Sequence, residues 1–225
     1  MSTNKNQNID GAAEIEQVIS KSEAFFEKYQ KHIIYSVLAV ILVACAIFLI
    51  SRFYMGPRAI EAQNQVVLGE RYFAVDSFAI ALNGNGDDFV GFAKIADEYN
   101  CTDAGNLSKA YAAICSYKLG EYEKAINYAD DFDGNGDVNV SVVMYGLMGD
   151  AASQLNKVEK ALSYYEKAYE SENKAFAPLY LKKAAILSFQ SGDKAKATEL
   201  FQLIKDKYIT STEAQDIDKY LEISK

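Results

Sequence analysis

The sequence predicts an all-α protein in which a single transmembrane helix is followed by an α-solenoid of stacked antiparallel helix pairs. Three alanines recur every 36 residues, each five positions after a glycine or an asparagine: Ala125, Ala161 and Ala197 follow Gly120, Asn156 and Gly192. A fixed interval of this size on helical sequence is typical of proteins whose units pack on their neighbours. The second observation is an uncharged apolar run from Ile33 to Ile50. The chain also has only two prolines and no alternating β-branched stretch, which favours helices over strands.

Residues 1–32 are expected to form a polar tail and an amphipathic helix. The first eight residues, MSTNKNQN, are polar and typical of disordered segments. After them, apolar side chains fall on one helical stripe, namely Ile15, Val18, Ile19, Phe25, Phe26 and Tyr29. Two interpretations of this stripe stay open: a helix lying in the membrane interface, and a helix packed on a partner protein.

Residues 33–54 are predicted to span a membrane. The 18 residues of the apolar run would cover about 27 Å as a helix, close to the hydrocarbon thickness of about 30 Å. Phe53 and Tyr54 suit the interface, and Gly56-Pro57 predicts a break before the next helix. The sequence Leu42-Val43-Ala44-Cys45 looks like a lipobox, but the apolar run continues beyond it. A neutral stretch of 32 residues also precedes the run, so an uncleaved anchor is favoured over a lipoprotein or a signal peptide.

The charges give no orientation for this span and argue against nucleic-acid binding. Three basic residues flank each side of the span: Lys21, Lys28 and Lys31 before it, and Arg52, Arg58 and Arg71 after it. Residues 53–225 contain 18 basic and 26 acidic residues, which accounts for the whole net charge of −8. Because phosphate binding needs clustered lysine and arginine, we expect no nucleic-acid partner.

Residues 58–225 are expected to form one helical domain. A long helix is predicted over 59–82, ended by Asn83-Gly84-Asn85-Gly86-Asp87, with Asp87 or Asp88 capping the next helix. Three repeats follow at 106–140, 141–174 and 175–208, with helices predicted at 106–119 and 121–132, 141–155 and 157–169, and 175–190 and 193–207. The turn residues Gly120, Asn156 and Gly192 suit the left-handed conformation that ends a helix. Thr210-Ser211-Thr212-Glu213 matches a capping box and predicts a final capping helix over 211–223.

The repeats resemble the tetratricopeptide repeat (TPR). The first contains Gly120-Glu121-Tyr122-Glu123-Lys124-Ala125-Ile126; the second has Tyr145, Met148, Gly149, Ala161, Tyr165 and Ala168 at signature positions; the third has Leu181, Gly192, Asp193, Ala197 and Phe201. The chain departs from the family in its 36-residue period, where about 34 is usual, in Lys109 where a large aromatic is expected, and in lacking the closing proline. The resemblance covers residues 106–208.

The TPR resemblance implies a concave binding face built by the first helix of each repeat. The candidate partner-binding residues carried over by position are Ile114, Tyr117, Asp150, Gln154, Lys182, Ile186 and Phe189, with Ala110, Gly146, Ser153 and Gln190 beside them. The alternative is that four of them are buried under neighbouring helices and belong to the core, namely Ile114, Tyr117, Ile186 and Phe189. The sequence does not decide between partner binding and burial for these four residues.

The sequence predicts no catalytic, cofactor or metal site, and therefore not an enzyme. His32 is the only histidine, so histidine-dependent triads and most zinc sites are excluded. Asp133-Gly134-Asn135-Gly136-Asp137 begins like a calcium loop, but Val138 and Met144 occupy the positions that need glycine and glutamate. Asn83–Asp87 fails in the same way, so both segments are interpreted as turns. Cys101 and Cys115 are expected to be small buried side chains, and their pairing is left open.

The layout of a short N-terminal helix, one span and an acidic TPR domain resembles the ancillary SecYEG translocon subunit family (YfgM-like). A local pattern adds to it: Ile95-Ala96-Asp97-Glu98-Tyr99, followed by Thr102-Asp103-Ala104-Gly105-Asn106-Leu107-Ser108. The resemblance implies an inner-membrane protein with residues 1–32 in the cytoplasm and residues 52–225 in the periplasm. It implies protein partners (translocon subunits, periplasmic chaperones or secreted clients) and an accessory or chaperone-like role. The alternative is a scaffold or assembly factor for another envelope complex, in cytochrome c maturation or outer-membrane assembly.

Overall fold

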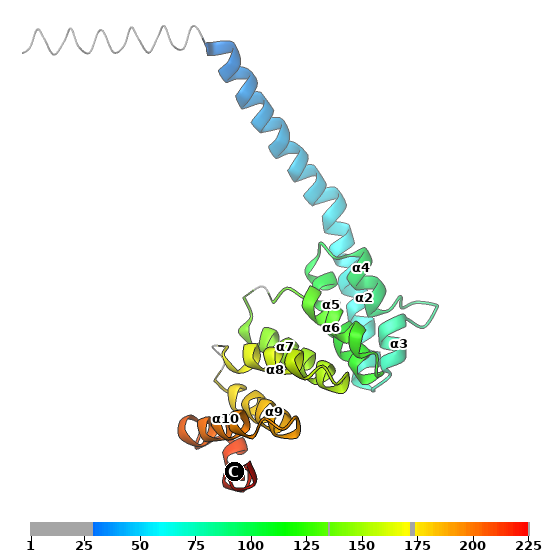
Figure 1. The fold of residues 1–225 in the computed structure, drawn as a ribbon. Helices are drawn as coiled ribbons and strands as arrows, with labels where there is room; N and C mark the ends of the chain where they lie inside the picture. Colours follow the sequence, from blue (N-terminus) through cyan, green and yellow to red (C-terminus); the bar gives the residue numbers. More distant parts are fainter. Residues whose placement is uncertain (1–28, 135, 172–173, 225) are drawn as a thin grey trace, which may run out of the picture. The chain divides into compact units, whose positions relative to one another are not determined.

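The computed structural model describes residues 29–134, 136–171 and 174–224 and divides into two units, Met1–Pro57 and Arg58–Lys225. All regular structure in these described ranges is helical, with no strand, which confirms the predicted all-α class (Figure 1). Of the N-terminal prediction, the polar tail and most of the amphipathic helix lie outside the described residues.

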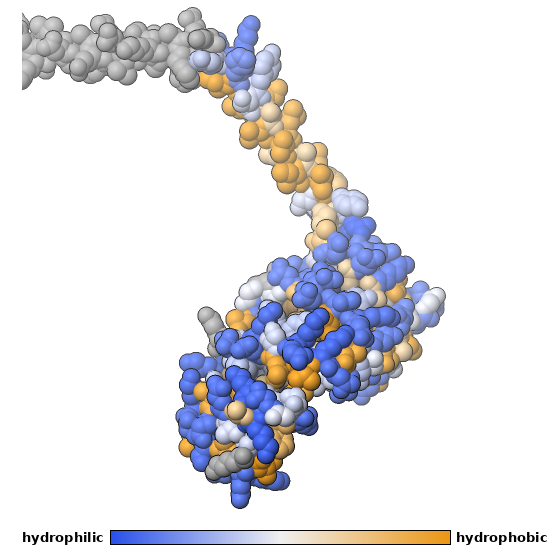
Figure 2. All heavy atoms as spheres, viewed as in Figure 1, coloured by the Kyte–Doolittle hydropathy of each residue, from blue (hydrophilic) through white to orange (hydrophobic). Residues whose placement is uncertain are grey.

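One helix of the described residues is long and apolar enough to cross a membrane. Helical structure runs from Tyr29 to Ala74, and its most apolar window has a mean hydropathy of 3.1 with none of it buried. Figure 2 shows the corresponding band of hydrophobic side chains on this helix. The predicted span at 33–54 lies within it.

The predicted break at Gly56-Pro57 is wrong, because the helix continues through both residues. A proline normally interrupts a helix, since it lacks the N–H group and its ring clashes with the carbonyl four residues earlier. Here a π-helical turn, η1 (Ser51–Met55), lies immediately before it, and the Gly56 N–H bonds to the carbonyl oxygen of Ser51, five residues back. This wider turn accommodates the proline without ending the helix.

The second unit begins with α2 (Gly56–Ala74), α3 (Phe78–Asn83) and α4 (Phe92–Glu98). The single helix predicted over 59–82 is wrong, because α2 ends at Ala74 and Asp76 adopts a left-handed conformation with φ of 56°. Aspartate tolerates this conformation better than most residues. The Ser77 N–H then bonds back to the Tyr72 carbonyl at 2.9 Å, which satisfies a carbonyl at the end of α2.

The next helix also begins later than predicted, and neither Asp87 nor Asp88 caps it. The cap position of α4 is Gly91, with φ of 92°. The side chain of Asn85 instead organises the preceding loop, because its Oδ1 accepts from the backbone N–H groups of Asp87 and Phe89 at 3.0 and 3.1 Å. This segment is a turn stabilised by its own asparagine.

Six longer helices follow, and each packs mainly against the helices before and after it in the chain (Figure 1). They are α5 (Asp103–Lys118), α6 (Tyr122–Asp131), α7 (Val138–Gln154), α8 (Val158–Tyr169), α9 (Ala177–Gln190) and α10 (Lys194–Lys207). α5 and α7 begin three residues earlier than predicted, because Thr102 and Asp137 cap them. Gly120, Asn156 and Gly192 all have positive φ, at 79°, 55° and 93°.

The C-terminal segment consists of a short 3-10 helix, η2 (Thr212–Ala214), and then α11 (Ile217–Ser224). The continuous capping helix predicted over 211–223 is therefore wrong in its first turn. Ser211 does act as a cap, because its hydroxyl accepts from the Ala214 N–H at 3.2 Å. What it caps is the 3-10 turn, and α11 starts only at Ile217.

Three ion pairs link positions about one repeat apart. Lys157 Nζ lies 3.3 Å from Glu123 Oε1, Lys183 Nζ lies 2.7 Å from Asp150 Oδ2, and Lys182 Nζ lies 2.5 Å from Asp216 Oδ1. The first pair joins α6 to the start of α8, the second joins α7 to α9, and the third joins α9 to the C-terminal segment.

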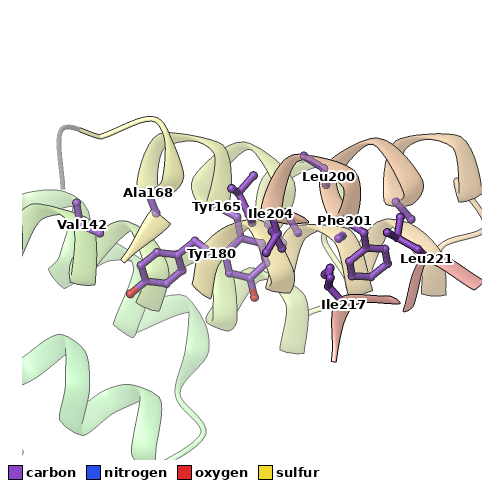
Figure 3. Packing of buried hydrophobic residues seen from close by; sticks show 14 of the residues in the cluster. Val142, Tyr165, Ala168, Tyr180, Leu200, Phe201, Ile204, Ile217 and Leu221 are labelled. Atoms are coloured by element: carbon purple, nitrogen blue, oxygen red, sulfur yellow. The ribbon is translucent and has the colours of Figure 1, made fainter. Parts of the chain in front are cut away.

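The largest hydrophobic cluster extends from α7 to α11, and two smaller clusters lie towards α2. Figure 3 shows its aromatic residues, with Tyr165 and Tyr180 at one end and Phe201 beside Leu221 at the other. The periodic alanines Ala125, Ala161 and Ala197 are each 0% exposed. The alanines that recur every 36 residues are therefore core residues of their helices.

Candidate functional site

The main candidate site is a small open pocket between α5 and α7. Its volume is about 270 Å³ and its exposed lining is entirely apolar. Leu107 is 40% exposed and Val143 is 36% exposed, so apolar side chains at its mouth are accessible to a partner. The pocket is lined by Leu107, Ala110, Tyr111, Ile114, Asn139, Val140, Val143, Met144 and Phe176. We refer to it below as the α5–α7 pocket.

The local sequence explains the pocket. α5 presents Ala110 where a larger side chain would fill the space between the two helices, and Leu107 and Ile114 lie one turn to either side. On the other wall, Asp137 caps α7, with its Oδ1 accepting from the N–H groups of Asn139 and Val140 at 2.8 and 3.3 Å. The cap fixes the start of the helix that carries the second wall.

Tyr111 forms a rigid wall of the pocket. Its ring stacks on that of Phe92 with centroids 4.6 Å apart, and its hydroxyl donates to Glu70 Oε1 at 2.9 Å. Burial, and then the hydrogen bond to Glu70, raise the pKa of Tyr111 to about 12. The phenol is therefore a neutral donor at physiological pH, and its hydrogen bond joins Glu70 of α2 to a residue that lines the pocket.

Of the seven residues predicted from the sequence, Ile114 lies in the α5–α7 pocket and packs against the cluster beneath it. Tyr117, one turn further along α5, packs edge-to-face against Tyr122 with centroids 5.5 Å apart. The pKa of Tyr117 is raised by burial and then by the charge of Asp150. Tyr117 and Asp150 are thus close enough to interact, as expected for neighbouring first helices.

Asp150 is held in an internal network that the sequence analysis missed. Its Oδ1 accepts from the Tyr165 hydroxyl at 2.8 Å, and both of its carboxylate oxygens accept from Lys183 Nζ. The Tyr165 ring stacks on Tyr180 at 6.4 Å, and Figure 3 shows the two side by side. Burial is the first cause of the raised pKa of both phenols, and the charge of Asp150 adds to it.

Lys182 faces the C-terminal segment of the chain itself. Besides its ion pair with Asp216, its ammonium lies 4.9 Å from the centroid of the Tyr220 ring. Asp216 has a lowered pKa, first because of the hydrogen bond from Lys182. Ile186 and Phe189 on the same helix are partly buried against the largest cluster. Gln154 is exposed at the end of α7.

The structure places the seven predicted residues in different settings. Ile114 lines the apolar pocket, Asp150 forms an ion pair with Lys183 near Tyr117, and Lys182 pairs with Asp216 of the C-terminal segment. The pocket residues from α7 and Phe176 were not predicted. Asp137, a good capping residue just before Val138, could have signalled that α7 begins earlier, but only packing shows that its first turns face Ile114.

Among the residues that the structure describes, no group of three or more histidine, cysteine, aspartate or glutamate side chains could hold a metal ion. Cys115 is buried, and burial raises the pKa of its thiol to about 12. The prediction that Cys101 is also buried is wrong, because it is exposed at the turn before α5. Both thiols are free.

Comparison of the chain with protein-family models and with curated proteins gives no match. The functional reading therefore rests on the residues and geometry described above.

Proposed function

We propose that this protein is a membrane-tethered protein-docking module whose second unit is a TPR-like solenoid. The observation that carries the proposal is the α5–α7 pocket, an open apolar site on consecutive first helices beside exposed Leu107 and Val143. Contiguous apolar surface that stays open on a folded domain marks interaction sites for proteins or ligands. The turn conformations at the 36-residue interval support the TPR-like assignment.

A docking function uses each part of the chain. The apolar helix tethers the domain, so its partners are encountered at a membrane. The helical packing holds the pocket in a preformed shape, which lowers the entropy cost of binding. Because the contact area at one small pocket is limited, we expect modest affinity that is controlled by the dissociation rate.

We further propose, from the resemblance to the ancillary translocon subunit family, that the partners are translocon subunits, periplasmic chaperones or secreted clients. In this proposal the N-terminus lies in the cytoplasm and the helical domain in the periplasm of an inner membrane. The acidic character of the domain suits a soluble domain that does not bind nucleic acid.

Photo-crosslinking in membranes tests this proposal. A photoreactive residue at position 143 lies in the pocket, whereas one at position 209 replaces Ile209, which is 76% exposed and outside the pocket. We expect partner adducts from position 143 and not from position 209. Translocon subunits or secreted clients among the adducts would support the proposed partners, whereas a different envelope complex would favour an assembly role. Equal adducts from both positions, or none from position 143, would refute docking at the pocket.

A further inference from the structure

The α5–α7 pocket is small enough to restrict what can occupy it. Pockets for small molecules usually measure roughly 300–1,000 Å³, whereas this one measures about 270 Å³. That volume suits one large side chain of a partner. Because its exposed lining is entirely apolar, the pocket itself discriminates only by shape and apolar area. Selection by charge has to come from the residues around its mouth.

Two carboxylates are hydrogen-bonded to residues that line the pocket, and a third lies one helical turn from a lining residue. Glu70 of α2 is bonded to the pocket residue Tyr111, and Asp137 is bonded to the backbone of the pocket residues Asn139 and Val140. Asp103 lies one turn before Leu107 on α5 and is exposed.

Three lysines also lie close to pocket residues in the sequence, and two of them contact groups outside the pocket lining. The Lys109 ammonium is directed to the carbonyl oxygen of Asp131, at 3.1 Å. Lys118, one turn beyond Ile114, lies 5.9 Å from the centroid of the Phe78 ring. Lys174, two residues before Phe176, is exposed. The carboxylates of Glu70 and Asp137, in contrast, are bonded directly to residues of the pocket wall.

We propose that the pocket selects protein segments in which a large apolar side chain stands next to lysine or arginine. The apolar side chain enters the pocket, and the adjacent cation lies at the mouth near Glu70 and Asp137. This inference rests on the proposed docking function and adds a charge preference to it. The partner is thus a basic and apolar polypeptide segment, and an acidic segment of equal hydrophobicity is rejected.

The expected preference is modest and sensitive to salt. Charge pairs at a solvent-exposed mouth contribute little individually, so two of them together change the affinity by about three- to tenfold. Screening reduces this further at high ionic strength, because the Debye length falls from about 10 Å at 0.1 M to about 3 Å at 1 M. The contribution of the apolar side chain does not depend on salt in this way.

The test uses the full chain in nanodiscs of phosphatidylcholine, a zwitterionic lipid with no net charge, with empty nanodiscs as the blank. Three short fluorescent peptides are compared by anisotropy: phenylalanine flanked by lysines, phenylalanine flanked by glutamates, and alanine flanked by lysines. We expect the first to bind tightest, and its advantage over the second to shrink at high salt. Equal binding of the lysine and glutamate peptides would overturn the charge preference.

Matched variants assign the preference to the mouth. Glu70→Gln keeps an acceptor for Tyr111, and Asp137→Asn keeps a good helix cap, so the double variant E70Q/D137N loses charge without losing these contacts. The control is E159Q/E222Q, which removes two exposed carboxylates elsewhere. We expect E70Q/D137N to weaken the lysine peptide by about three- to tenfold and the control to leave it unchanged. An equal effect of both would mean general attraction by the acidic domain and would overturn the assignment.

A further variant separates failure of this inference from failure of the docking proposal. Val143→Gln makes the pocket mouth polar without adding charge. Docking at the pocket is refuted if V143Q binds the phenylalanine–lysine peptide as tightly as the unchanged chain does, and if the alanine peptide binds as tightly as the phenylalanine–lysine peptide. If both lose binding while E70Q/D137N does not, docking stands and the charge preference is refuted.

Discussion

Replacing Asp150 with alanine is expected to destabilise the fold, although sequence reasoning placed this residue in a partner-binding groove. The change removes the acceptor of the Tyr165 hydroxyl and the counter-ion of Lys183. Tyr165 is only 4% exposed, so its hydroxyl would be left without an acceptor in a dry environment. A hydrogen bond to a charged group contributes about 1.5–3 kcal/mol. The ion pair adds at most about 1 kcal/mol, because its side chains are 35% and 26% exposed.

The expected loss for D150A is therefore about 2–4 kcal/mol in the free energy of unfolding. For a chain of this length the midpoint of thermal unfolding should fall by about 4–16 °C. Asp150→Asn retains an acceptor for Tyr165 and should lose about 1 kcal/mol. Glu159→Ala removes an exposed carboxylate of α8 and serves as the control, with an expected change below about 0.5 kcal/mol.

Circular dichroism of the full chain in nanodiscs measures these midpoints, and a double-mutant cycle with Tyr165→Phe isolates the hydrogen bond. The double variant D150A/Y165F should lose about 1.5–3 kcal/mol less free energy of unfolding than the sum of the losses of the two single variants. If the two changes are additive, and D150A abolishes crosslinking from position 143 with an unchanged midpoint, the internal role is wrong and Asp150 contacts the partner.

Three further predictions follow from buried groups and from the one exposed thiol of the helical domain. The pKa of Tyr180 is raised from 10.0 to about 12, chiefly by burial, and that of Tyr165 is raised as well. Since the pKa of both phenols is raised in the folded state, the stability they contribute is complete below pH 10 and is lost as the pH rises towards 12. Unfolding midpoints from pH 8 to 12 should show this fall, and Tyr180→Phe should make it shallower without abolishing it, because the pKa values of Tyr111 and Tyr169 are also raised to about 12. In a Cys45→Ser background, an impermeant maleimide added to whole spheroplasts should label exposed Cys101 and not buried Cys115, whose thiol pKa is about 12. Cys101→Ser should abolish this labelling. Labelling that requires membrane permeabilisation would contradict the proposed periplasmic orientation. Gly146→Ala places a methyl group against the Tyr180 ring and should cost about 1–3 kcal/mol, with Ser153→Ala on the same helix as the thermal-unfolding control; an unchanged midpoint for G146A would contradict this packing.

Local sequence predicts the helical class, the apolar helix and the left-handed turns. The turns are predictable because a glycine or asparagine that follows a periodic helix usually ends it in the left-handed conformation. The break at Val75-Asp76-Ser77 does not follow from local sequence, since none of these residues is a strong helix terminator and an aspartate seldom adopts the positive φ that Asp76 has. The helix break predicted at Pro57 is wrong for the opposite reason. Proline is a strong local signal for a break, but the neighbouring π-helical turn accommodates it.

The residues of the candidate site were likewise only partly predictable from the sequence. Ile114 could be identified from its repeat position, and Asp150 was placed on the correct helix. Its partner Lys183 could not be chosen over the adjacent Lys182, because side chains 33 residues apart in sequence meet only through the packing of α7 on α9. Lys182 turns instead towards Asp216, and no local pattern distinguishes the two lysines.

The three ion pairs between successive repeats have a consequence for how the chain tolerates rearrangement. The junction between the second and third repeats has its carboxylate on the N-terminal side, at Asp150, whereas the junction to the C-terminal segment has its ammonium there, at Lys182. Both of these pairs depend on α9, because it supplies Lys183 to one and Lys182 to the other. A chain shortened by α9 and α10 would lose both pairs at once and would leave Asp150 and Asp216 without their lysines. Two adjacent lysines, one paired with an earlier helix and one with a later segment, thus join the C-terminal segment to α7 through a single helix.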